Sequence, residues 1–218
     1  MVSGFLMTLA ACAGDPGTTT GQAERPAVIP AAAWNSQPDP ISESLRHVPL
    51  RVTVHHAGVT WKKDDDPYRK LVALQSWGKR DKGWPDVPYH FLVAPDGRIF
   101  EGRALAYEGE TNTEYDVTGH VLVQLWGDFE VQRVSLPQLE SSVRLIAWLC
   151  QQYQIPPAAI AGHLDWSEQT VCPGRDLYRY IKGGDLRGWV EETLKGARPQ
   201  IELRRALPNG PTEFVSSN

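Results

Sequence analysis

The sequence predicts an α/β fold in which a mixed central β-sheet is flanked by α-helices. Three observations predict it: a β-hairpin pattern over residues 88–103, an apolar strand over residues 121–126, and two long segments with apolar residues at helical spacing. A hairpin gives an antiparallel strand pair, whereas strands that alternate with helices favour parallel pairs. At 218 residues the chain is long enough to bury a core as one domain with extensions.

The N-terminal part of the chain predicts export followed by a tether. Residues 1–12 form a short apolar segment, and its end, Leu9-Ala10-Ala11-Cys12, is similar to a bacterial lipobox, in which the cysteine receives a lipid. The segment is too short to span a bilayer as a helix. Residues 13–37 are rich in Pro, Gly, Thr and Ala, which predicts a flexible tether. We therefore expect a lipoprotein of the cell envelope, periplasmic or anchored in the outer membrane through Cys12.

The folded domain is predicted over residues 38–199. Its first strand covers residues 49–55, where β-branched residues lead to a histidine. A helix is expected to begin at Asp66-Pro67, since proline is favoured at the first helical position, and to end near Gly78. The hairpin follows, with strands over residues 88–94 and 98–103 joined by the tight turn Pro95-Asp96-Gly97.

Two further helices follow the central strand of residues 121–126. Ser135 is expected to cap a helix that runs to about Tyr153, and Asp185 to begin a last helix that reaches about Leu194. We interpret the apolar stripe of the longer helix as core, and it consists of Leu139, Val143, Ile146 and Leu149. Residues 200–218 are predicted to be a loosely packed tail.

Charge and cysteine content exclude two classes of protein. The 22 basic and 26 acidic residues give a net charge of −4, so no basic field is available to hold nucleic acid. The 3 cysteines cannot all pair within one chain, which argues against a disulfide scaffold. Cys150 lies in an apolar run and is expected to be a buried free thiol.

Residues 162–174, called the metal loop below, suggest a metal site. His163 and Cys172 lie in this helix-breaking stretch, and His55 ends the first strand, where rigid sheet meets a loop. Imidazole nitrogen and thiolate are favoured zinc ligands, and a catalytic zinc needs three protein ligands and an open position. A histidine pair alone is more often solvated or in a core, and a lone cysteine is more often a small buried hydrophobe. The hypothesis therefore depends on the combination.

His55, His163 and Cys172, with Tyr89-His90-Phe91 between them and Pro173-Gly174 after the cysteine, resemble the zinc amidases of the N-acetylmuramoyl-L-alanine amidase type 2 family. That family includes phage amidase lysozymes and peptidoglycan recognition proteins, and the resemblance covers roughly residues 48–182. It implies the same α/β architecture with a Zn²⁺ site at one end of the sheet, held by His55, His163 and Cys172.

The resemblance also implies a function: hydrolysis of the amide between N-acetylmuramic acid and L-alanine in cell-wall turnover. Peptidoglycan or a muropeptide would be the partner, and we expect a monomer. The alternative is a recognition module that binds muropeptides without cutting them. Family members of that kind typically lose the cysteine ligand, and Cys172 is present here.

Two residues match family positions that assist the reaction. Tyr89 is expected to orient the water at the zinc, and Thr170 is a candidate hydrogen-bond donor to the oxyanion that forms on attack. The competing interpretations are a packing aromatic for Tyr89 and a turn residue for Thr170. His56 and His90 are expected to be structural, and Asp165 is expected to brace the metal loop.

The segment Tyr107-Glu108-Gly109 departs from the family pattern, in which many members carry Trp-His-x-Gly at this place. In relatives this segment lines the substrate groove. The departure leaves open whether the substrate is the intact sacculus or a soluble muropeptide.

Overall fold

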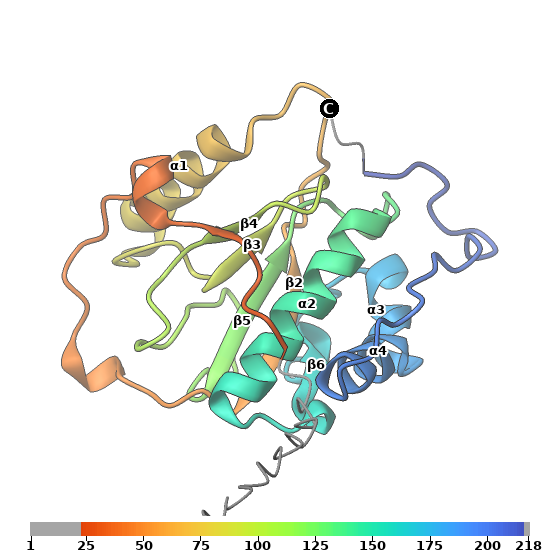
Figure 1. Ribbon diagram of the computed structural model, residues 1–218. Helices are drawn as coiled ribbons and strands as arrows, with labels where there is room; N and C mark the ends of the chain where they lie inside the picture. The colour runs from red at the N-terminus through yellow and green to blue at the C-terminus, as the bar shows by residue number, and fades with distance from the viewer. Residues whose placement is uncertain (1–22, 216–218) are drawn as a thin grey trace, which may run out of the picture.

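The computed structural model describes residues 23–215 (Figure 1). The signal segment of residues 1–12, with the lipobox Cys12, and residues 13–22 of the expected tether lie outside the described residues.

Six strands form one mixed sheet, which confirms the predicted fold class. Their order across the sheet is β1-β4-β3-β5-β2-β6. The strands are β1 (Val28–Ile29), β2 (Arg51–His56), β3 (Phe91–Val93), β4 (Ile99–Glu101), β5 (His120–Leu125) and β6 (Ile160–Gly162). The predicted hairpin is the antiparallel pair β3 and β4, and the other neighbouring strands run parallel. The predicted central strand, β5, lies between β3 and β2.

The helices are α1 (Pro67–Trp77), α2 (Leu136–Tyr153), α3 (Arg175–Lys182) and α4 (Asp185–Leu194). Asp66 caps α1 by accepting from the Tyr68 amide, and Ser135 caps α2 in a capping box with Gln138, as the sequence predicts. The sequence did not predict α3, because it has only eight residues and follows Gly174 (φ 84°) with no side-chain cap. Within residues 23–215, no helix combines the length and the apolar character needed to cross a membrane.

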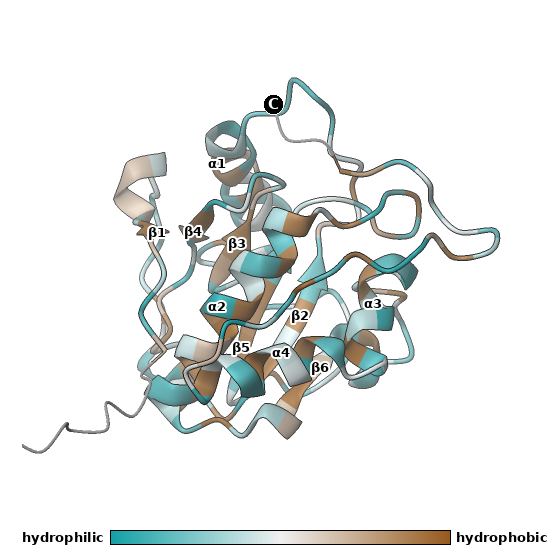
Figure 2. Ribbon diagram, turned by 45° about the vertical axis from the view of Figure 1, so that its right-hand side comes forward, coloured by the Kyte–Doolittle hydropathy of each residue, from teal (hydrophilic) through white to brown (hydrophobic). Residues whose placement is uncertain are grey.

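Strand alternation gives the centre of the sheet two unlike faces. One face of β2 and β5 carries apolar side chains that join α2 in the core: Val52, Val54, Val121, Val123 and Leu125. Figure 1 shows α2 lying across the sheet, and the predicted stripe of this helix is buried in the same core. The other face carries Thr53, His55, His120 and Gln124, all buried outside that cluster. In Figure 2, β3 and β4 are coloured mainly as hydrophobic, whereas α2 carries both hydrophobic and hydrophilic residues.

The expectation of a flexible tether is wrong for residues 23–37. β1 pairs in parallel with β4, and the Trp34 ring is 2% exposed. The Trp34 indole N–H donates to the carbonyl of Glu101 (2.8 Å), and the Ala31 amide donates to the Glu101 carboxylate (3.0 Å). The Pro- and Ala-rich composition of the segment hid this, because one large aromatic residue and a two-residue strand are enough to hold it.

The expectation of a loosely packed tail is also wrong for residues 201–215. Val215 is buried, its amide donates to the Arg133 carbonyl (2.8 Å), and the Arg133 amide donates to the Glu213 carbonyl (2.7 Å). Ile201 and Leu203 pack against the core. The chain beyond α4 therefore returns along the domain and contributes to it.

Trp34→Ala is expected to lower the free energy of unfolding by about 3–5 kcal/mol, because it empties a fully enclosed aromatic site. Urea unfolding measures the change. Trp166→Ala, at a ring that is 36% exposed, is the control and should cost clearly less. An unchanged free energy of unfolding for Trp34→Ala would return residues 23–37 to the role of a tether.

Candidate metal centre

The three residues that the sequence suggests as zinc ligands meet in space. His55 lies near the end of β2, His163 directly follows β6, and Cys172 lies in the loop before α3. Their potential ligand atoms all lie within 4.8 Å of one another, and all three residues are buried. Among the described residues this is the one cluster of His, Cys, Asp and Glu that could hold a metal ion.

Strand pairing brings the two histidines together. β2 and β6 are parallel neighbours with Val54 opposite Gly162, so both strands end at the same edge of the sheet. The rings of His55 and His163 are 4.5 Å apart between centroids. Asp165 braces the loop as expected, because its carboxylate accepts from the Gly162 amide (2.7 Å) and from the Tyr178 hydroxyl (2.6 Å).

The donor atoms fit a zinc ion. Nδ1 of His55 lies 3.6 Å from Sγ of Cys172. Zinc bonds of about 2.0–2.1 Å to nitrogen and about 2.3 Å to sulfur, at a tetrahedral angle, put the two ligand atoms about 3.5 Å apart. The backbone N–H of His56 also points at the Cys172 sulfur (3.3 Å), which favours the thiolate form that a metal binds.

The protonation states suit ligation by the two histidines. Burial, followed by the charge of His163, lowers the pKa of His55 well below its ordinary value. Burial, followed by the charge of His56, lowers the pKa of His163 to about 4. Both rings are therefore neutral at pH 7 and keep a lone pair for a metal. Burial raises the pKa of Cys172 to about 12, so metal binding must displace the thiol proton.

A cavity of about 160 Å³ opens beside the three residues, and Tyr89 and Thr170 both line it. The Tyr89 ring lies 5.2 Å from the His55 ring between centroids. Burial, with the nearby Cys172 as the second cause, raises the pKa of Tyr89, so its hydroxyl stays protonated at neutral pH and can donate a hydrogen bond.

Thr170 has a visible structural role. Its hydroxyl oxygen accepts from the Cys172 amide (3.0 Å). This is the turn role that the sequence offers as the alternative to a catalytic role. Because the oxygen accepts in this bond, the hydroxyl proton stays available to donate toward the cavity.

His56 and His90 lie outside the cluster, as expected. Nδ1 of His56 accepts from the Phe129 amide (3.2 Å). Nδ1 of His90 accepts from the Leu122 amide (2.8 Å), and its Nε2 donates to the Tyr107 carbonyl (2.9 Å). Each ring thus links a strand to a loop through hydrogen bonds.

The loop between β4 and β5 (residues 102–119) contributes site residues that the sequence interpretation missed. Thr113 Oγ1 lies 2.6 Å from Nε2 of His163 and fixes the orientation of that ring. Glu110 lines the cavity and pairs with the fully buried guanidinium of Arg103 (3.3 Å). Threonines and a glutamate in a polar loop give no signal of such roles in one sequence.

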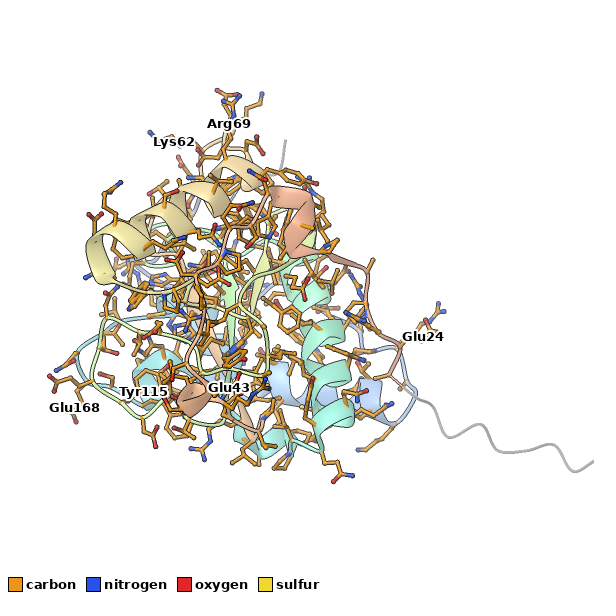
Figure 3. The ribbon with its side chains drawn as sticks, turned by 90° about the vertical axis from the view of Figure 1, so that its left-hand side faces the viewer. Glu24, Glu43, Lys62, Arg69, Tyr115 and Glu168 are labelled. Atoms are coloured by element: carbon orange, nitrogen blue, oxygen red, sulfur yellow. The ribbon has the colours of Figure 1, made fainter. Side chains whose placement is uncertain are left out.

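This loop lies against the metal loop. The Glu114 amide donates to the Gln169 side chain (2.9 Å), and Figure 3 shows Tyr115 and Glu168 on the same side of the molecule, away from Lys62 and Arg69. Glu108, in the segment that departs from the family pattern, does not line the cavity. Its carboxylate accepts from the Thr118 hydroxyl (2.8 Å) instead.

Comparison with known proteins agrees with the family resemblance seen in the sequence. A family model described as N-acetylmuramoyl-L-alanine amidase matches residues 46–175, more than half of the chain. The chain is 28% identical to mouse (Mus musculus) peptidoglycan recognition protein 1 over 164 residues, which are 71% of this chain and 86% of the relative.

Two solved structures illustrate the likeness in fold. The crystal structure of Drosophila peptidoglycan recognition protein SD matches with a TM-score of 0.65 and 25% identity, over 73% of this chain and 94% of that one. The endolysin N-acetylmuramoyl-L-alanine amidase LysCS from Clostridium intestinale URNW matches with a TM-score of 0.56 and 24% identity, over 71% and 91% of the two chains.

Proposed function

The chain belongs to the N-acetylmuramoyl-L-alanine amidase family, and on this premise we propose that it is a zinc-dependent hydrolase of peptidoglycan or of muropeptides. The bond it cuts is the amide between N-acetylmuramic acid and L-alanine. One observation carries the proposal: two imidazoles and a thiol converge beside a cavity that Tyr89 also lines.

His55, His163 and Cys172 would hold the zinc ion. When bound, zinc supplies a Lewis acid that polarises the amide carbonyl and makes water a nucleophile near neutral pH. All three donors come from one chain, so the zinc site needs no ligand from a second copy of the protein.

The residues of the cavity contribute position and hydrogen bonds. The protonated hydroxyl of Tyr89 can donate toward the attacking water or toward the carbonyl oxygen on which negative charge develops. The Thr170 hydroxyl offers a second donor beside the same cavity. Asp165 and Thr113 hold the loop and the His163 ring, so the donors are fixed before the substrate arrives.

The competing function is recognition of muropeptides without cleavage. Relatives named as peptidoglycan recognition proteins favour it. The complete set of three donors favours hydrolysis, because a module that only binds needs no metal ligands.

Digestion of defined substrates tests the proposal. The purified protein is incubated with intact sacculi and, separately, with soluble muropeptides, with and without a chelator, and the products are identified by mass spectrometry. We expect stem peptides with a free L-alanine amino group, lost on chelation and restored by zinc. Binding of muropeptides without such products, in zinc-loaded protein, would overturn hydrolysis in favour of recognition.

We also propose that Cys12 is lipidated and holds the protein at the cell envelope, supported by the lipobox-like Leu9-Ala10-Ala11-Cys12. A fatty-acid analogue should label the wild-type protein and the control Cys150→Ser, whose thiol is buried in α2. Cys12→Ser should lose the label. Unchanged labelling of Cys12→Ser would contradict the anchor.

A further inference from the structure

Within residues 23–215, three buried polar atoms beside the metal centre have no hydrogen-bond partner: the Tyr115 hydroxyl, Nε2 of His55 and Oε1 of Gln124. The last two belong to residues that are 1% and 3% exposed, so bulk water does not reach them freely. Buried polar groups in native proteins nearly always find a partner, because leaving one unpaired costs its full desolvation. Two such atoms close to a metal site therefore require an explanation.

The two residues are direct neighbours in the sheet. β2 and β5 run in parallel with His55 opposite Gln124, so both side chains project from the same face. Adjacent strands lie about 4.8 Å apart, a distance that a glutamine side chain spans. Rotation about the last torsion of glutamine is soft, so the amide oxygen can turn to the imidazole at little cost.

The two atoms are chemically complementary. Nδ1 of His55 faces the Cys172 sulfur at 3.6 Å and is the nitrogen available to a metal. In a neutral ring that ligates through Nδ1, Nε2 carries the proton and needs an acceptor. Oε1 of Gln124 is an acceptor that lacks a donor.

Tyr89 lies beside the same pair. Its ring is 5.2 Å from the His55 ring between centroids, and it lines the cavity together with His55. The amide N–H of Gln124 is a donor, and the Tyr89 hydroxyl can accept from it. Gln124 can therefore contact a metal ligand with its oxygen and a candidate catalytic group with its nitrogen. A carboxylate would offer only acceptors, and an apolar side chain would offer neither.

We propose that Gln124 is a positioning residue: its Oε1 accepts from Nε2–H of His55, and its amide N–H donates to the Tyr89 hydroxyl. The first bond fixes the tautomer that leaves Nδ1 of His55 free to ligate, and the second fixes the direction of the hydroxyl. The inference rests on the proposed zinc site and adds to it the group that aligns a ligand with Tyr89. It also explains a buried polar residue within the apolar run of β5.

Three variants separate positioning from packing. Gln124→Met keeps the length of the side chain and removes both hydrogen bonds. Gln124→Glu keeps the acceptor for His55 and loses the donor to Tyr89. Leu122→Met is the matched control, because Leu122 is fully buried on the same face of the same strand. Thermal melting checks that each variant folds.

Zinc affinity is measured by competition with a chromophoric chelator, and turnover on a soluble muropeptide. Gln124→Met should bind zinc about 10–100-fold more weakly than wild type, the usual effect of losing a hydrogen bond to a ligating histidine. Gln124→Glu should keep the wild-type affinity and lose at least about tenfold in turnover. Leu122→Met should match wild type in both. Equal zinc affinity in Gln124→Met and wild type would overturn the proposal, even if turnover changed.

A spectroscopic readout is independent of activity. In the zinc-loaded protein labelled with ¹⁵N, the His55 ring should carry a slowly exchanging proton on Nε2, and that signal should exchange faster in Gln124→Met. A proton on Nδ1 of His55 would overturn the proposal. If the wild-type protein takes up no zinc, this inference and the proposed function both fail. If it takes up zinc but cuts no muropeptide, the proposed function fails and the affinity and tautomer results still decide the inference.

Discussion

Replacing Cys172 by alanine is expected to abolish stoichiometric zinc binding and to reduce muropeptide hydrolysis to background. The change removes the sulfur donor from a three-residue set and leaves His55 and His163, whereas a catalytic zinc needs three protein ligands. The loss in zinc affinity should exceed the roughly 10–100-fold effect of losing a hydrogen bond to a ligand. Metal analysis of the dialysed protein and a turnover assay measure the two effects.

Cys150→Ala is the control for this experiment. Cys150 is also a buried free thiol, and burial raises its pKa to about 12, but it lies in α2 and outside the metal cluster. The Cys150→Ala protein should keep both bound zinc and hydrolytic activity. Stoichiometric zinc in purified Cys172→Ala would remove that residue from the ligand set.

Tyr89→Phe is expected to keep zinc and the melting temperature and to lose at least about tenfold in turnover number. The substitution removes only the hydroxyl, and the ring beside His55 stays in place. A single positioned donor or acid-base group is typically worth about 10²–10⁴-fold in rate, and a water molecule can replace part of it. Turnover is measured on a muropeptide at saturating zinc.

Tyr180→Phe is the matched control for Tyr89→Phe. Its hydroxyl accepts from the Arg204 amide (2.9 Å), and the residue lies in α3 away from the cavity, so its loss should affect stability and leave turnover unchanged. Wild-type turnover in Tyr89→Phe would exclude a catalytic role for that hydroxyl. Thr170 would then be the remaining candidate donor.

The regular elements could be predicted because their signals are local. Asp66 and Ser135 cap the two predicted long helices, and the tight turn after residue 94 joins the hairpin. Each signal lies within a few residues of the element that it specifies. The segment of residues 23–37 could not be assigned in this way, because its structure depends on a pairing of β1 with the distant β4.

The three donors could be proposed from their residue types and from the family resemblance, but their proximity could not. It depends on β2 and β6 lying side by side, with His55 and Cys172 117 positions apart in sequence. The supporting contacts were even less accessible. Thr113 carries no sequence signal, and the one hint for Gln124, a polar residue in an apolar strand, acquires meaning only when His55 lies beside it.

X-ray absorption at the zinc edge of the purified wild-type protein tests the central claim most directly. That claim is that His55, His163 and Cys172 hold a single zinc ion beside an open cavity. We expect one sulfur neighbour at about 2.3 Å and two imidazole nitrogens at about 2.0–2.1 Å, with a light atom completing four-fold coordination. A protein without zinc, or a zinc shell without sulfur, would contradict it.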